Sequence, residues 1–181
     1  MEAILSKEII VNRTLCRIIG VAVFVILMSL GAFVRIPLPF SPVPLTLQTF
    51  FVLLSGAMLG SNMGAISQLS YVFLGVSGLP IFSGATSGPF YLLGPTGGYL
   101  FGFILAALFV GKFIKYSQNN LFSTLGILFL GDLIILTSGT VWLKLILGYP
   151  LPKLLLIGFL PFLPGDLFKV FIAGFIYLRL N

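Results

Sequence analysis

The sequence of 181 residues contains no histidine, a single cysteine (Cys16) and only four acidic residues. Without histidine the chain lacks the commonest general base and metal ligand, which excludes Ser-His catalysis and zinc proteolysis. One cysteine excludes an intrachain disulfide and a thiolate metal site. Charged residues make up 8% of the chain, against about a quarter in soluble domains, so the composition excludes an ordinary soluble domain.

What the chain has instead is apolar sequence, with 59% hydrophobic residues, 21 glycines and 11 prolines. Such a composition is typical of a polytopic membrane protein, in which glycine and proline serve close helix packing and broken helices. At about 20 residues per span, the length allows roughly six helices. We therefore expect an all-α membrane protein, a bundle of six transmembrane helices that forms one integral membrane domain over residues 1–181. The net charge of +6 is too thinly spread to indicate nucleic-acid binding.

The expected spans follow the apolar segments of the sequence. They cover about 17–35, 45–59, 64–79, 97–110, 121–147 and 164–179. Residues 1–16 are expected at the membrane surface, because this short segment mixes charges of both signs. The apolar run after it is longer than that of a usual signal peptide, so we interpret it as the first retained span. Gly56, Gly60 and Gly64 lie where spans two and three meet, in a spacing that allows two backbones to pack closely.

Two connecting segments cannot be regular helices. Four prolines between Pro37 and Pro44 forbid a continuous helix, and residues 80–96 are rich in glycine, serine and proline. Irregular backbone in a membrane protein lies outside the bilayer or lines a cavity. A phosphate-binding loop is excluded, because the Gly111-Lys112 pair is followed by Phe113 and not by serine or threonine. Any use of ATP therefore requires a partner protein.

Orientation in the cell membrane follows from the basic residues, which favour the cytoplasmic side. With both termini cytoplasmic, six spans place six basic residues inside: Lys7, Arg13, Arg17, Lys112, Lys115 and Arg179. Four remain toward the outside or at membrane depth: Arg35, Lys144, Lys153 and Lys169. The proline segment and the glycine-rich loop lie at this outer end. A pocket that opens outward is expected there.

The segment from Pro161 to Lys169 carries a carboxylate and an ammonium three residues apart in a nearly charge-free chain. Pro164 suits the first position of a helix, which puts Asp166 in the first turn, where the helix dipole favours a carboxylate. Lys169 then shares its face. In a soluble protein this would be a local ion pair at a helix start. At membrane depth such groups are costly and face a cavity or a partner, so we interpret the pair as the polar end of a ligand site.

Four sequence blocks form a recognisable set: Ser41 to Thr49, Leu79 to Phe82, Gly94 to Tyr99 and Phe162 to Lys169. Together they resemble the BioY family, the biotin-specific substrate-binding (S) components of energy-coupling factor (ECF) transporters. The similarity runs in order from about residue 17 to 179. It implies a six-helix S component that captures biotin from outside. A transmembrane coupling subunit and two ATP-binding cassette ATPases would supply the energy, so the chain itself would be no enzyme and would need no cofactor.

The resemblance also implies which residues hold biotin. Asp166 and Lys169 match the family's site, and the loop from Ile81 to Gly94 matches a segment that closes over the ligand. Asp166 would accept hydrogen bonds from the ureido N–H groups. Lys169 would donate to the ureido carbonyl or pair with the ligand carboxylate, and its closeness to Asp166, about 5–6 Å between Cβ atoms, favours the ureido end. Arg35 is then a candidate for the carboxylate. Further polar or stacking candidates are Gln48, Thr86, Tyr91 and Thr96.

The first span departs from the family pattern. S components often carry an Ala-xxx-Ala face that docks on the coupling subunit, whereas Ala22 is followed four residues later by Ile26. The small residues available on this span are Gly20, Ala22, Ser29 and Gly31.

Two alternative functions stay open at this stage. One is an S component for another small vitamin. The other is an intramembrane aspartyl protease that uses Asp132 and Asp166, although Leu163 occupies the first glycine position of the Gly-x-Gly-Asp signature. Asp132 lies in the middle of an apolar span. It should therefore be neutral, paired with Lys169 or Lys144, or exposed to a cavity.

Overall fold

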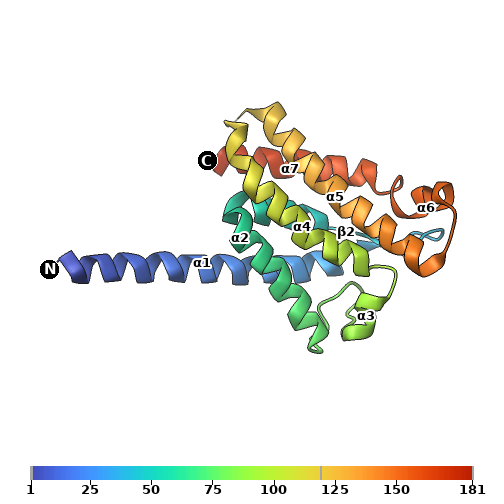
Figure 1. Ribbon diagram of the computed structural model, residues 1–181, viewed down its shortest axis with the longest axis horizontal. Helices are drawn as coiled ribbons and strands as arrows, with labels where there is room; N and C mark the ends of the chain where they lie inside the picture. The colour runs from blue at the N-terminus through green and yellow to red at the C-terminus, as the bar shows by residue number, and fades with distance from the viewer. Residues whose placement is uncertain (1, 119, 181) are drawn as a thin grey trace.

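The computed structural model describes the backbone of residues 2–118 and 120–180, and the side chains of these residues from Thr14 onward. The chain is mostly helical, which confirms the predicted all-α class. In order, the elements are α1 (Glu2–Phe33), β1 (Arg35–Ile36), β2 (Leu45–Thr46), α2 (Gln48–Val76), α3 (Pro89–Leu93), α4 (Gly97–Phe113), the 3₁₀ helix η1 (Ile114–Ser117), α5 (Leu121–Leu147), α6 (Leu151–Gly158) and α7 (Leu163–Leu180) (Figure 1).

Within the described residues, four helices are long and apolar enough to cross a membrane. They are Thr14–Phe33, Gln48–Val76, Gly97–Ser117 and Leu121–Leu147. The pair α6 and α7, bent by 49°, counts as a fifth if it is one broken span. The predicted spans 121–147 and 164–179 agree closely with α5 and α7. The ends of α5 are marked by Asn120 as an N-cap and Gly148 as a left-handed C-cap.

Helix α2 folds back on itself at Gly60. This residue has φ 78° and ψ 176°, a backbone conformation open to glycine and strained for other residues. Residues before and after the break then pair across the two halves. The Gln68 amide donates to the Ser55 hydroxyl at 2.9 Å, and the Gln48 amide donates to the Tyr71 hydroxyl at 2.8 Å. The predicted spans 45–59 and 64–79 correspond to these two halves.

Glycines allow the helices at the centre to pack closely. A Cβ atom on Gly64 would lie 3.0 Å from the Cα of Gly56, so the predicted close approach of two backbones is confirmed. On α4, Gly98 lies against Trp142 and Gly102 lies against the backbone of Ile135. Helix α4 is therefore sandwiched between α2 and α5 in the core of the bundle (Figure 1).

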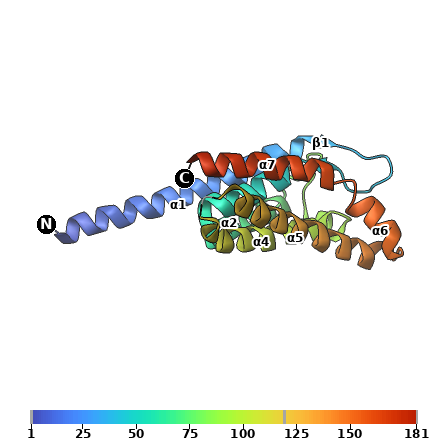
Figure 2. The same cartoon turned by 90° about the horizontal axis from the view of Figure 1, so that it is seen from above.

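Helix α1 runs without a break across residue 16, where we expected a boundary between a surface segment and the first span. Its N-terminal part extends beyond the bundle in both ribbon views (Figures 1 and 2). The side chains of Lys7 and Arg13, used above for orientation, lie outside the described residues.

The small residues of α1 do not form one outward face. A Cβ atom on Gly20 would lie 2.8 Å from Leu59, and one on Gly31 would lie 2.9 Å from Phe51. Both glycines therefore pack on α2. Of the small residues offered for docking, Ala22 remains exposed.

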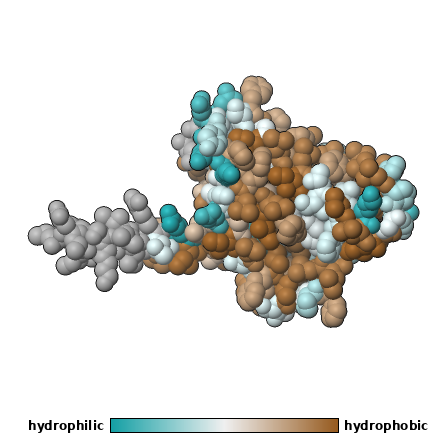
Figure 3. Space-filling model, viewed as in Figure 1, coloured by the Kyte–Doolittle hydropathy of each residue, from teal (hydrophilic) through white to brown (hydrophobic). Residues whose placement is uncertain are grey.

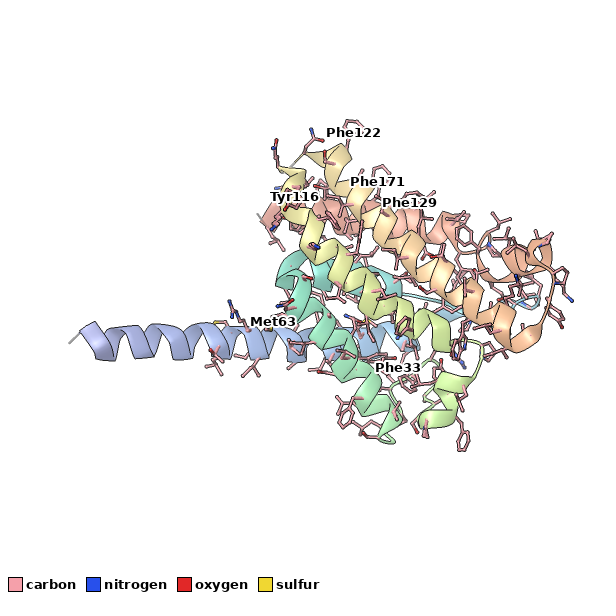
Figure 4. All side chains as sticks on the ribbon, viewed as in Figure 1. Phe33, Met63, Tyr116, Phe122, Phe129 and Phe171 are labelled. Carbon is pink, nitrogen blue, oxygen red and sulfur yellow. The ribbon has the colours of Figure 1, made fainter. Side chains whose placement is uncertain are left out.

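The outside of the bundle is apolar over most of the visible face (Figure 3). Large side chains such as Phe122 and Phe171 are 83% and 59% exposed, and Phe122 lies at the edge of the bundle in Figure 4. Among the described side chains, the two carboxylates, Asp132 and Asp166, are both buried. An apolar exterior with its acidic groups inside is the arrangement expected in a lipid bilayer.

The proline-rich segment closes one end of the bundle as a short hairpin. Strands β1 and β2 pair antiparallel, with Arg35 opposite Thr46 and Ile36 opposite Leu45. The Ser41 hydroxyl in the connecting loop donates to the Ile157 carbonyl of α6 at 2.6 Å. This end of the bundle also holds the start of α7, where the predicted ligand site lies.

Candidate ligand-binding site

An ion pair opens α7, as the spacing predicts. The Lys169 ammonium lies 2.7 Å from Oδ1 of Asp166, three residues earlier on the same face. The Asp166 side chain is 1% exposed and that of Lys169 is 13% exposed. A buried pair of this kind is tolerable only where hydrogen bonds satisfy both partners, so the surrounding donors and acceptors matter.

The start of α2 and the end of β2 supply these groups. The Lys169 ammonium donates to the Thr46 carbonyl at 2.6 Å and to the Thr49 hydroxyl at 2.9 Å. The Thr49 hydroxyl in turn donates to Oδ1 of Asp166 at 3.0 Å. The second oxygen of Asp166, Oδ2, is buried with no hydrogen-bond partner among the described residues. The site thus keeps one unused acceptor.

A cavity of about 40 Å³ adjoins this pair. Its walls come from the hairpin, α2, the glycine-rich loop, α4, α5 and α7: Val43, Pro44, Thr46, Gln48, Thr49, Ser83, Tyr91, Thr96, Tyr99, Leu100, Phe103, Leu136, Phe162, Asp166 and Lys169. One water needs about 10–15 Å³, and ligand pockets hold roughly 300–1,000 Å³. The cavity therefore admits a few waters, and a vitamin-sized ligand requires a wall to move.

Five of the seven candidate residues line this cavity. They are Gln48, Tyr91, Thr96, Asp166 and Lys169. These residues lie as far as 121 positions apart in the chain (169 − 48), and the fold brings them to one cavity. Thr49 and Ser83 also line the cavity but were not among the candidates. Thr49 belongs to the block that ends the proline segment, and this is the signal that could have identified it.

The other two candidates, Thr86 and Arg35, lie outside the cavity wall. Thr86 is exposed, and its hydroxyl donates to the Ser83 carbonyl at 3.0 Å within the loop. Arg35 is also exposed, and its guanidinium covers Gly84, where a Cβ atom would lie 2.4 Å from Nη1. Thr86 therefore bonds within the glycine-rich loop and Arg35 packs on it. The structure brings neither side chain to the ion pair.

The loop from Ile81 to Gly94, the lid loop from here on, covers the cavity. Its Phe82 ring is fully buried and stacks on Tyr91, with 4.6 Å between centroids and 13° between planes. The Tyr71 hydroxyl donates to the Ile81 carbonyl at 2.9 Å and accepts from the Gln48 amide. The first residues of the lid loop are thus anchored to α2.

Asp132 lies outside the wall of this cavity. It is fully buried on α5, it does not line the cavity, and neither carboxylate oxygen has a hydrogen-bond partner among the described residues. Of the three states expected for Asp132, pairing with Lys169 or Lys144 is absent from the ion pairs of the described residues. An unpaired carboxylate is costly to bury in its charged form. Of the neutral, paired and cavity-exposed states, the neutral state therefore fits Asp132 best.

A larger groove of about 610 Å³ lies between α4 and α5. Its walls include Leu92, Phe101, Ile104, Val141 and Leu145, and it contains none of the charged groups. Ligand sites combine an apolar wall with a few converging polar groups. The smaller cavity meets that description, so we take it as the candidate site.

Comparison with known proteins shows the family of the chain. The sequence profile of the BioY family matches residues 6–181. The chain belongs to the BioY family. The biotin transporter BioY of Thermotoga maritima is 40% identical over 166 residues, which cover 91% of this chain and 95% of the relative. A probable biotin transporter BioY of Pyrococcus horikoshii is 40% identical over 161 residues, covering 89% and 93%.

A solved structure shares the fold. The crystal structure of the S component for biotin from an ECF-type ABC transporter superposes with a TM-score of 0.88 at 30% identity, and the match covers 93% of this chain and 92% of that one. The predicted S-component type of fold is therefore confirmed.

Proposed function

We propose that this BioY-family chain captures biotin and serves its uptake as the S component of an ECF-type ABC transporter. Its similarity to biotin transporters and to a solved S component for biotin supports biotin as the ligand. The observation that carries the proposal is Oδ2 of Asp166, a buried acceptor without a partner beside a cavity. A buried acceptor left unsatisfied is costly, and a ligand donor relieves that cost.

Biotin has the chemistry to do so. Its ureido ring offers two N–H donors, and a hydrogen bond to a charged group contributes about 1.5–3 kcal/mol. Tyr91 adds an aromatic side chain to the wall of the cavity, and Gln48 and Thr96 supply further polar groups. An ammonium has three N–H donors, and Lys169 donates one each to Thr46, Thr49 and Asp166. A bond from Lys169 to the ligand therefore requires one of these to be given up.

Access of biotin to the site requires the lid loop to move, because a cavity of about 40 Å³ cannot hold it. The part after Phe82 is the candidate for this motion. It includes Gly84 and Ala85, both with positive φ, and its helix α3 has no buried residue. We propose that residues 83–93 swing away from the cavity while Ile81 and Phe82 stay anchored on Tyr71. Arg35, which is exposed and lies over Gly84, is then the candidate partner for the ligand carboxylate at the mouth of the site.

The topology we propose has six membrane-embedded segments. These are α1, the two halves of α2 on either side of Gly60, α4, α5 and α7. With both termini in the cytoplasm, the site opens to the outside of the cell. The chain has no phosphate-binding loop, so energy would come from a transmembrane coupling subunit and ATP-binding cassette ATPases in the same membrane. An intramembrane protease is not favoured, because Asp132 and Asp166 do not line one cavity.

Calorimetric titration of the detergent-purified chain with biotin tests the ligand. We expect saturable binding that excess thiamine, riboflavin and niacin do not displace. Displacement by one of these vitamins, together with weak or absent biotin binding, would assign the chain to another vitamin.

Reconstitution in liposomes tests the partners. Concentrative biotin uptake should require the coupling subunit, the ATPases and ATP. Concentrative uptake by the 181-residue chain alone would contradict the S-component mechanism.

A further inference from the structure

Thr49 is, among the described side chains, the one that bonds to both members of the ion pair. Its hydroxyl lies 3.0 Å from Oδ1 of Asp166 and 2.9 Å from the ammonium of Lys169. It stands on the first turn of α2, 117 residues away from Asp166 in the chain. None of the functional assignments made above uses it.

The direction of these hydrogen bonds is fixed by chemistry. An ammonium can only donate and a carboxylate can only accept. The Thr49 hydroxyl must therefore accept from Lys169 and spend its one proton on Oδ1 of Asp166. Lys169 also donates to Oδ1, at 2.7 Å. Oδ1 thus accepts two protein donors, while Oδ2 accepts none among the described residues.

This asymmetry sets the rotation of the Asp166 carboxylate. If the Thr49 hydroxyl were absent, Lys169 would have a free N–H and Oδ1 would lose one donor. The carboxylate could then turn so that the ammonium bonds to both oxygens, as buried charges pair most strongly when their donors and acceptors are satisfied. Oδ2 would then be bonded to Lys169 and would no longer be available as an acceptor for a ligand.

We propose that Thr49 is a positioning residue that holds Oδ1 so that Oδ2 stays available to a ligand N–H donor. The inference rests on the proposed biotin function. It adds that Thr49 makes the site select ligands that present N–H donors. The site then prefers a ligand that presents N–H groups over one of the same shape that lacks them, because the latter leaves Oδ2 unsatisfied. Thr49 acts through Asp166 and need not touch the ligand.

The test compares Thr49→Val and Thr49→Ser with the unaltered chain. Each purified protein is titrated with biotin and with a biotin analogue of the same shape in which oxygen replaces both ureido N–H groups. We expect the unaltered chain to prefer biotin, and Thr49→Val to bind biotin about tenfold more weakly with little change for the oxygen analogue. The ratio of the two affinities therefore falls about tenfold. Thr49→Ser, which keeps the hydroxyl, should restore the ratio to within threefold.

Thr137→Val is the matched control, because the Thr137 hydroxyl is exposed and bonds to carbonyls of its own helix. It should leave both affinities unchanged. A merely structural role for Thr49 would lower the melting temperature without changing the affinity ratio, and that result would overturn the inference while leaving biotin capture intact. Failure of the unaltered chain to bind biotin would overturn both proposals.

Discussion

The ring of Phe82 in the lid loop lies directly on Gly75 of α2, so closely that a Cβ atom at residue 75 would be 2.2 Å from it. Phe82 is fully buried there and contacts Tyr71 edge-on, with 5.6 Å between centroids. Gly75→Ala should therefore expel the ring and loosen the lid loop. We expect biotin affinity to fall about tenfold, with faster hydrogen exchange in residues 81–94.

The control for this change is Gly126→Ala on α5. A Cβ atom at residue 126 would meet nothing within 4 Å, and alanine favours a helix over glycine by up to about 1 kcal/mol. Gly126→Ala should keep biotin affinity and match or exceed the original stability. Equal affinities for the two variants would show that the Phe82 anchor does not contribute to the binding site.

The lid loop should also respond to the ligand itself. Its part beyond Phe82 buries little apolar surface, and segments with few buried contacts open at low free-energy cost. We expect amides of residues 83–93 to exchange rapidly without biotin and to be protected with it, while amides near Tyr71 change little. Hydrogen exchange followed by mass spectrometry measures both, and identical exchange with and without biotin would remove the lid from the mechanism.

Local features of the fold could be predicted from the sequence. Asp166 and Lys169 form the expected pair because a spacing of three places two side chains on one helix face. The bounds of α5 followed from an apolar run between Asn120 and Gly148, whose capping roles depend on neighbouring residues alone. Such inferences need no knowledge of the tertiary structure.

Contacts between distant segments could not be predicted in the same way. Whether Thr49 contacts Asp166 depends on how α2 and α7 cross, which no local pattern records. The loop candidates show the same limit. Thr86 and Tyr91 both looked suitable, but positive φ at Gly84 and Ala85 turns the chain, so that Tyr91 lines the cavity and Thr86 bonds within the loop.

The two buried carboxylates allow the sharpest comparison. In Asp166→Asn the amide must keep its oxygen at the Oδ1 position, because Thr49 and Lys169 both donate there. Its NH₂ group then replaces Oδ2 and presents a donor to the ureido donors of biotin. We expect at least tenfold weaker binding by calorimetry, with the fold retained. Unchanged affinity would show that Oδ2 is not the ligand's acceptor.

Asp132→Asn makes the same chemical change at a position outside the cavity. Both Asp132 oxygens are buried without a described partner, and Asp132 is expected to be neutral, so an amide of the same shape leaves the charge inside the bundle unchanged. Biotin affinity should stay within twofold of the original, and the melting temperature should change little. A large loss of affinity in Asp132→Asn alone would place the ligand's acceptor on α5, because the two variants make the same substitution at the two buried carboxyl groups.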